Sequence, residues 1–82
     1  MRVKKKDGEY EAFSEDKLIN SIAKSGVSIA HAQKIAKEVV TEITTGAGDD
    51  VLDSVLIREH VITKLAKAFP LEAESYKTYS KT

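Results

Sequence analysis

The sequence predicts an α+β domain in which an amino-terminal β-hairpin packs over a four-helix bundle. Three observations predict it: an Asp7-Gly8 pair between two extended runs, apolar residues at three- and four-residue spacing through most of the remaining chain, and a single late proline, Pro70. Gly beside Asp suits a tight reversal because Gly tolerates positive φ, and a lone hairpin needs support from the helices. We therefore predict one domain over residues 1–82, with a hairpin at 2–13 and helices at about 15–25, 28–45, 54–69 and 70–80.

Two registers are open to the hairpin. If Asp7 and Gly8 form a two-residue turn, Lys4 faces Glu11 across the strands. If the turn takes in a third residue, the register slips by one and Lys4 faces Tyr10 instead. The sequence does not decide between the two.

The first two helices have clear start and stop signals. Ser14 can accept a free backbone N–H ahead of two acidic residues, and Gly26 ends the first helix. Ser28 can cap the second helix, which we expect to end at Gly46. Their apolar faces are Leu18, Ile19, Ile22 and Ala23 in the first helix, and Ala32, Ile35, Ala36, Val39, Val40 and Ile43 in the second.

The last two helices meet at Pro70. We expect an irregular connection from Gly46 to Asp50, and a third helix that opens at Asp53 or Ser54. The residue before a proline avoids the helical region, so the third helix ends near Phe69 and Pro70 begins the fourth. Their inward sides are predicted to be Ile57, Val61, Ile62, Leu65, Ala66 and Phe69, then Leu71, Ala73, Tyr76 and Tyr79.

Composition excludes several classes of protein. Lys plus Arg and Asp plus Glu number 13 each in 82 residues, so the net charge is zero and no global basic field favours nucleic acid. The chain has no cysteine, which fits a reducing compartment, and no apolar run near the roughly 20 residues of a membrane span. We expect a cytoplasmic protein that does not associate with a membrane.

The charges are nevertheless uneven, because Arg2 and Lys4 to Lys6 place four cations at the amino end without an acid among them. A nucleoside triphosphate needs several cations that converge beside a helix amino end. Lys5 and Lys6 could meet Lys17 of the first helix in this way. The alternative is a solvated hairpin whose lysines make weak cross-strand pairs with acidic neighbours.

A resemblance to a known family sharpens this interpretation. It rests on Lys5-Lys6-Asp7-Gly8 followed by Glu11, Phe13 and Lys17, on a third helix entered at Ser54, and on Pro70 followed by Ala73, Tyr76 and Tyr79. These features together resemble the ATP-cone domain, the nucleotide-sensing module of ribonucleotide reductases and of a bacterial repressor of their genes. The likeness covers roughly residues 2–80.

The resemblance implies a site for ATP or dATP beneath the hairpin, with Mg²⁺ carried by the nucleotide. It places the two hairpin lysines on the phosphates, and it departs from the common family pattern at Lys6, Ser14 and Arg58. The implied site residues are Val3, Lys5, Lys6, Asp7, Gly8, Glu11, Ser14, Lys17, Ser54 and Arg58.

The function implied is regulatory, without catalysis of its own. The partner would be a fused or associated catalytic domain, or a second copy in a homo-oligomer. The alternatives are a small nucleic-acid binder, which the zero net charge counts against, and a helical protein-interaction domain without a nucleotide. Sequence alone does not separate ATP from dATP.

Other chemistry-bearing residues have plainer interpretations. Tyr10, Tyr76 and Tyr79 could stack on a base, but aromatic residues at this spacing more often pack in a core or at its rim. His31 and His60 lack metal-ligand spacing, so we expect them to be ordinary helix-surface residues without a metal or catalytic role.

Overall fold

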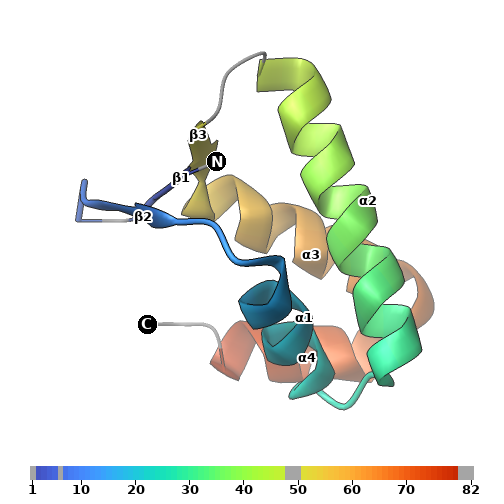
Figure 1. Ribbon diagram of the computed structural model, residues 1–82. Coiled ribbons are helices and arrows are strands. Elements are labelled where there is room, and N and C mark those ends of the chain that lie inside the picture. The colour runs from blue at the N-terminus through green and yellow to red at the C-terminus, as the bar shows by residue number, and fades with distance from the viewer. Residues whose placement is uncertain (1, 6, 48–50, 80–82) are drawn as a thin grey trace.

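The structure, a computed structural model, describes residues 2–5, 7–47 and 51–79, without the side chains of 45–47 and 79. In chain order its elements are β1 (Arg2–Lys4), β2 (Tyr10–Ala12), α1 (Glu15–Ala23), α2 (Ile29–Ala47), β3 (Val51–Asp53), α3 (Ser54–Ala68) and α4 (Pro70–Tyr79). The strands form a small sheet beside the helices, and the turn of the hairpin extends away from them (Figure 1). The α+β fold class is confirmed.

The hairpin adopts the second of the two registers. Lys4 faces Tyr10 and Val3 faces Glu11. The backbone N–H of Lys5 donates to the carbonyl of Glu9 (2.8 Å), and that of Gly8 donates to the carbonyl of Lys5 (3.0 Å). Gly8 has a φ of 88°, a conformation in which only glycine is unstrained. A three-residue turn closed by a glycine with positive φ fits the right-handed twist of the strands.

The sheet has a third strand that the sequence did not predict. Residues 51–53 form β3, which pairs in parallel with β1 so that the strand order is β2-β1-β3. The predicted start of α3 is confirmed, because the Asp53 carboxylate accepts the backbone N–H of Val55 (2.8 Å) and Ser54 is the first helical residue. A three-residue strand that pairs with a segment far away in the sequence carries no local signal of its own.

The helices lie close to their predicted bounds, with two differences at carboxyl ends. α1 ends at Ala23, and residues 24–26 form a turn in which Gly26 has a φ of 112°. α2 was predicted to end at Gly46 but continues to Ala47, because a glycine weakens a helix by only about 1 kcal/mol and does not forbid it. Of the predicted irregular connection, residues 48–50 lie outside the described part of the chain.

α4 begins at Pro70 as predicted, but one of its expected inward residues points outward. Ala73 and Tyr76 are buried, whereas Leu71 is 80% exposed. Residues 71 and 73 are about 200° apart around a helix, so both cannot face the core. The buried position of Tyr76 confirms packing as its role.

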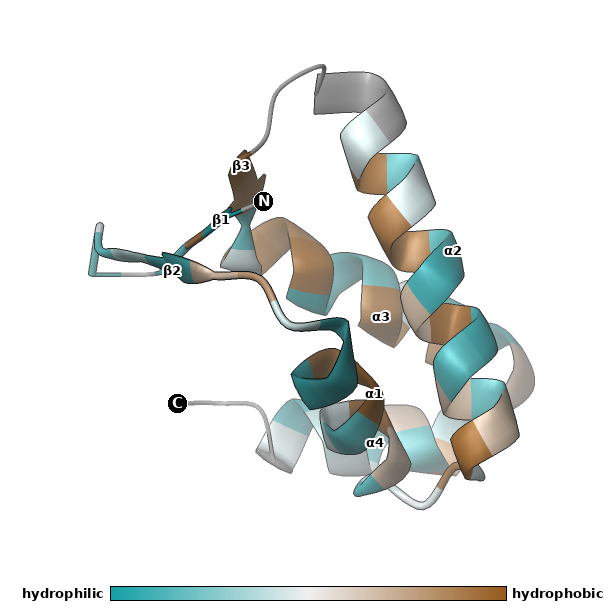
Figure 2. Ribbon diagram, in the orientation of Figure 1, coloured by the Kyte–Doolittle hydropathy of each residue, from teal (hydrophilic) through white to brown (hydrophobic). Residues whose placement is uncertain are grey.

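The core joins the sheet to all four helices. Ile22, Leu52, Leu65, Val39 and Val61 are its largest fully buried side chains. Figure 2 shows α2 alternating between hydrophobic and hydrophilic around its circumference, as an amphipathic helix does. Among the described residues, no helix combines the length and the apolar character needed to cross a bilayer.

Candidate functional site

One face of the hairpin is directed toward the helices. Val3 is buried in the core that the helices share. Side chains alternate along a strand, so Lys5 lies on the same face as Val3. Glu11 is opposite Val3, and its carboxylate lies 3.7 Å from the ammonium group of Lys5. The register therefore brings together three of the predicted site residues on the inner face.

The outer face of the hairpin carries a different set of cations. Arg2 and Lys4 are both exposed, and the Arg2 guanidinium stacks over the ring of Tyr10 at 4.8 Å. The Tyr10 side chain is therefore paired within the sheet, at its rim. The three described cations at the amino end thus do not form one patch, because alternation sends Arg2 and Lys4 to the face opposite that of Lys5.

The amino ends of α1 and α3 both lie next to the sheet. Ser14, two residues after β2, caps α1 by accepting the backbone N–H of Lys17 (3.3 Å). On the other side, Lys4 pairs with Asp53, the residue that caps α3, so the end of β1 lies beside the amino end of α3. Lys5 is the next residue of the chain after this pair, at the point where the hairpin turn begins.

Arg58 follows Ser54 by one helical turn and reaches α4. Its guanidinium donates to the backbone carbonyl of Lys77 at 3.4 Å. Figure 1 shows the end of α4 on the same side of the molecule as the hairpin. Arg58 therefore connects the α3 face of the candidate site to the last turn of α4, while Lys17 lies exposed on α1.

Two further predicted site residues shape the turn of the hairpin. The Asp7 carboxylate accepts the backbone N–H of Glu9 (3.0 Å), which fixes the turn, and Gly8 supplies the positive φ. Nothing lies within 4 Å of a Cβ added at Gly8, so its requirement is conformational. Lys6 lies outside the described residues.

This arrangement is suited to an anion. A lysine beside a helix amino end, with free backbone N–H groups and a positive dipole, is a common way to bind phosphate. The inner face is open near the turn, where the side chains of Lys5 and Glu11 are about half exposed. Four of the concavities in the described part of the chain lie along α1, α2 and α3, and none of these four is lined by a hairpin residue.

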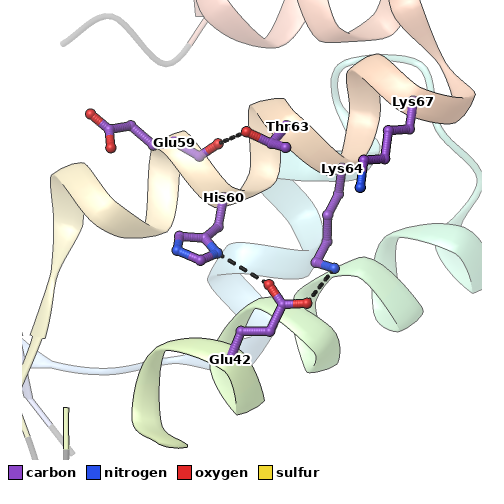
Figure 3. Close-up of a pocket in the computed structure, with 6 residues that line it drawn as sticks. All are labelled: Glu42, Glu59, His60, Thr63, Lys64 and Lys67. Atoms are coloured by element: carbon purple, nitrogen blue, oxygen red, sulfur yellow. Dashed lines mark hydrogen bonds and ion pairs between the residues drawn. The ribbon is translucent and has the colours of Figure 1, made fainter. Parts of the chain in front are cut away.

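The clearest charged cluster was missed by sequence reasoning. Between α2 and α3, the Lys64 ammonium group lies 2.6 Å from Glu42, and His60 Nδ1 lies 3.1 Å from Glu42 (Figure 3). Glu38 lies 3.3 Å from the same ammonium group. The hydrogen bond from Lys64, and then that from His60, lowers the pKa of Glu42, while the bond to Glu42 raises the pKa of Lys64. The available signal was a pair of charged groups four residues apart on each helix.

Both histidines lie at the helix surface and have defined neighbours. His31 Nδ1 lies 2.8 Å from the Ser28 hydroxyl, and its ring packs edge to face against Phe69 at 5.2 Å. His60 contacts Glu42 as described above. Within the described ranges, no group of three or more His, Asp or Glu side chains is placed to hold a metal ion.

Comparison with known proteins adds two findings. The family model described as "ATP cone domain" matches residues 1–82, the whole chain. A curated protein of Archaeoglobus fulgidus, described as an uncharacterized protein, is 37% identical over 46 residues, which are 56% of this chain and 98% of its own length. That relative has no described function to compare.

Proposed function

This chain belongs to the ATP-cone family, a family of nucleotide-binding regulatory domains, and on that premise we propose that it binds ATP or dATP beneath its hairpin to regulate a partner. The observation that carries the proposal is that β1 ends beside the amino end of α3, where Lys4 pairs with the capping residue Asp53. Lys5 follows next in the chain and lies on the inner face of the hairpin with Glu11. Lys5 and the amino end of α3 would hold the phosphates. Mg²⁺ would arrive with the nucleotide.

The remaining predicted site residues would lie around the phosphate-binding groups, Lys5 and the amino end of α3. Val3 provides an apolar floor, and Glu11 lies where it can accept hydrogen bonds from a base or ribose. Ser14 and Lys17 would approach from α1, and Lys6 from the turn. Because Lys5 and Glu11 are half exposed, the hairpin would have to close over the nucleotide to exclude water from it.

Closure offers a way to pass occupancy to a partner. Arg58 contacts the last turn of α4 through the Lys77 carbonyl, so a phosphate that attracts the guanidinium would weaken this contact. A shift of α4 would then alter the surface presented to a fused or associated catalytic domain, or to a second copy. A coupling of about 1 to 3 kcal/mol is typical of such regulation, and it is reciprocal. We expect no catalysis by this chain itself.

The test is calorimetric titration of the 82-residue chain with ATP and dATP at low millimolar Mg²⁺. We expect a saturable heat with each nucleotide, and their relative affinities identify the preferred one. The absence of heat up to about 1 mM nucleotide, which corresponds to binding weaker than about −4 kcal/mol, would contradict the proposal.

Paired variants locate the phosphates. Lys5→Ala with Lys6→Ala should abolish binding, whereas Lys4→Ala, on the outer face of the same strand, should change affinity less than about threefold because exposed charges are well screened. None of these variants should change the melting temperature without nucleotide by more than about 2 °C, since surface substitutions have small effects. Equal losses in the two variants would place the phosphate site elsewhere.

A further inference from the structure

A second cation-rich site lies on another side of the molecule. It is a concavity of about 350 Å³ between the amino half of α2 and the carboxyl end of α3, which we call the α2–α3 pocket. Its lining includes His31, Lys34, Ile35, Lys64, Lys67 and Phe69. α3 runs from Ser54 to Ala68, so about 20 Å of helix separates this pocket from the candidate nucleotide site.

The pocket carries more positive than negative charge. Three lysines line it against one carboxylate, Glu38. Lys64 is already matched by Glu38 and Glu42, whereas neither Lys34 nor Lys67 makes an ion pair within the described part of the chain. Two unmatched ammonium groups from different helices therefore line one concavity.

The directions of the lysine side chains and the dipole of α2 both add to the positive charge of the pocket. Figure 3 shows Lys67 extended from α3 to the same side as Lys64, toward α2. Lys34 lies near the positive amino end of α2, and the first turn of α2 carries no acidic residue, whereas that of α1 has Glu15 and Asp16. The dipole favours an anion at this end and does not account for a lysine there.

The rest of the pocket is apolar and well fixed. Ile35 is buried, and Phe69 is half-buried with the His31 ring against it at 5.2 Å. The hydrogen bond between Ser28 and His31 fixes that ring in turn. An aromatic wall beside ammonium groups suits a ligand with one anionic end and one flat or short-chain apolar end.

We propose that the α2–α3 pocket binds a small phosphate monoester, with the phosphate between Lys34 and Lys67 and its organic group against Phe69 and Ile35. Its volume is at the lower end for ligand pockets, about 300 to 1,000 Å³, so the ligand is a small metabolite. The site is independent of the hairpin and of the nucleotide proposed there.

The probe is phenyl phosphate, titrated into ¹⁵N-labelled 82-residue chain and followed by amide chemical shifts. We expect saturable shifts at His31, Lys34 and Phe69, and weaker binding of inorganic phosphate, which has no ring to pack. Shifts confined to the hairpin and the start of α3, or shifts near Phe69 that do not saturate, would overturn the proposal. The nucleotide site and the α2–α3 pocket are each monitored by their own amide signals. A negative result at one site therefore does not affect the result at the other.

Charge variants must act in opposite directions. Lys34→Gln and Lys67→Gln should each weaken phenyl phosphate binding about three- to fivefold, the usual effect of one exposed charge contact. Glu38→Gln should strengthen it, because it removes the one carboxylate of the pocket and leaves Lys64 held by Glu42. All three side chains are at the surface, so the fold should be retained.

Lys4→Gln is the matched control, since it removes the same charge on the outer face of the sheet. We expect it to leave phenyl phosphate binding unchanged. If Lys4→Gln and Lys67→Gln reduce phenyl phosphate affinity equally, or if Glu38→Gln weakens binding, the effect is one of overall charge and the proposed pocket is refuted.

Discussion

Two lysines show how differently the two sides of this molecule use positive charge. Lys64 on α3 is held by two carboxylates at 2.6 and 3.3 Å, and its side chain is only 21% exposed. Lys5 on the hairpin has Glu11 at 3.7 Å and is 50% exposed. Lys64 therefore joins two helices by ion pairs, while Lys5 has one carboxylate at a longer distance and a side chain that is half exposed.

The same contrast holds for packing. α2 and α3 meet through fully buried side chains such as Val39, Val61 and Leu65. The sheet is attached to the helices through few residues, chiefly Val3 and Leu52. A region with so few buried contacts can change conformation at low cost, which is what closure over a nucleotide would require.

The largest expected effect comes from breaking that attachment. Leu52→Ala should lower the free energy of unfolding by about 2 to 5 kcal/mol, because Leu52 is fully buried and its removal leaves a cavity under the sheet. Urea denaturation followed by circular dichroism measures the loss. Leu56→Ala is the matched control, since Leu56 is 45% exposed, and a similar loss in both variants would show that the sheet is not held in this way.

Replacing Lys64 should lower the stability of the fold and leave nucleotide binding unchanged. Lys64→Met keeps the apolar stem but leaves Glu38 and Glu42 without their shared cation. We expect the free energy of unfolding to fall by about 1 kcal/mol, with ATP affinity unchanged in calorimetry. Loss of ATP affinity in this variant, at retained stability, would reverse the roles assigned to the two lysines.

The smallest expected effect is a dependence of folding stability on pH at acidic values. Since Lys64 holds the pKa of Glu42 below its ordinary value of 4.5, the folded state gains stability that is complete above that pH and is lost as the pH falls through the lowered pKa. Glu42→Gln lacks this contribution. The two proteins should differ in melting temperature at pH 7 and converge toward pH 3.

At alkaline pH the same ion pair makes stability depend on pH in the opposite direction: the folded state loses stability as the pH rises. Glu42 raises the pKa of Lys64 above 10.5, so the contribution of Lys64 is complete below that pH and is lost only as the pH rises beyond it. The difference between wild type and Glu42→Gln should therefore stay constant between about pH 8 and 9, where Glu42 and Lys64 are both charged and histidine side chains are ordinarily neutral. A difference that grows toward pH 3 would contradict this account.

Much of the fold could be predicted because its signals are local. Ser14, Ser28 and Asp53 cap their helices as their side chains allow, and Pro70 divides the last two helices. β3 could not be predicted, because three residues have too little pattern and their pairing with β1 joins segments almost fifty residues apart. The outward position of Leu71 shows the limit of assigning a face to a short helix by apolarity alone.

The candidate site could be predicted only as a set of residue types. Lys5, Glu11 and Ser54 were identified from the sequence. The proximity of Lys5 to Glu11 depends on the hairpin register, and the place of Ser54 next to the sheet depends on β3; both involve hydrogen bonds between separate strands. The α2–α3 ion cluster escaped prediction for the same reason. Its members are unremarkable surface residues until α2 and α3 lie side by side.

The sequence by itself determined where helices start and stop, which faces are apolar, and that the amino end is rich in lysine, since these depend on interactions within a few residues. Only the tertiary structure decided which lysines are matched by carboxylates and which remain available. That outcome depends on distances between segments remote in the chain, and these are set by the packing of the core and the pairing of β1 with β3.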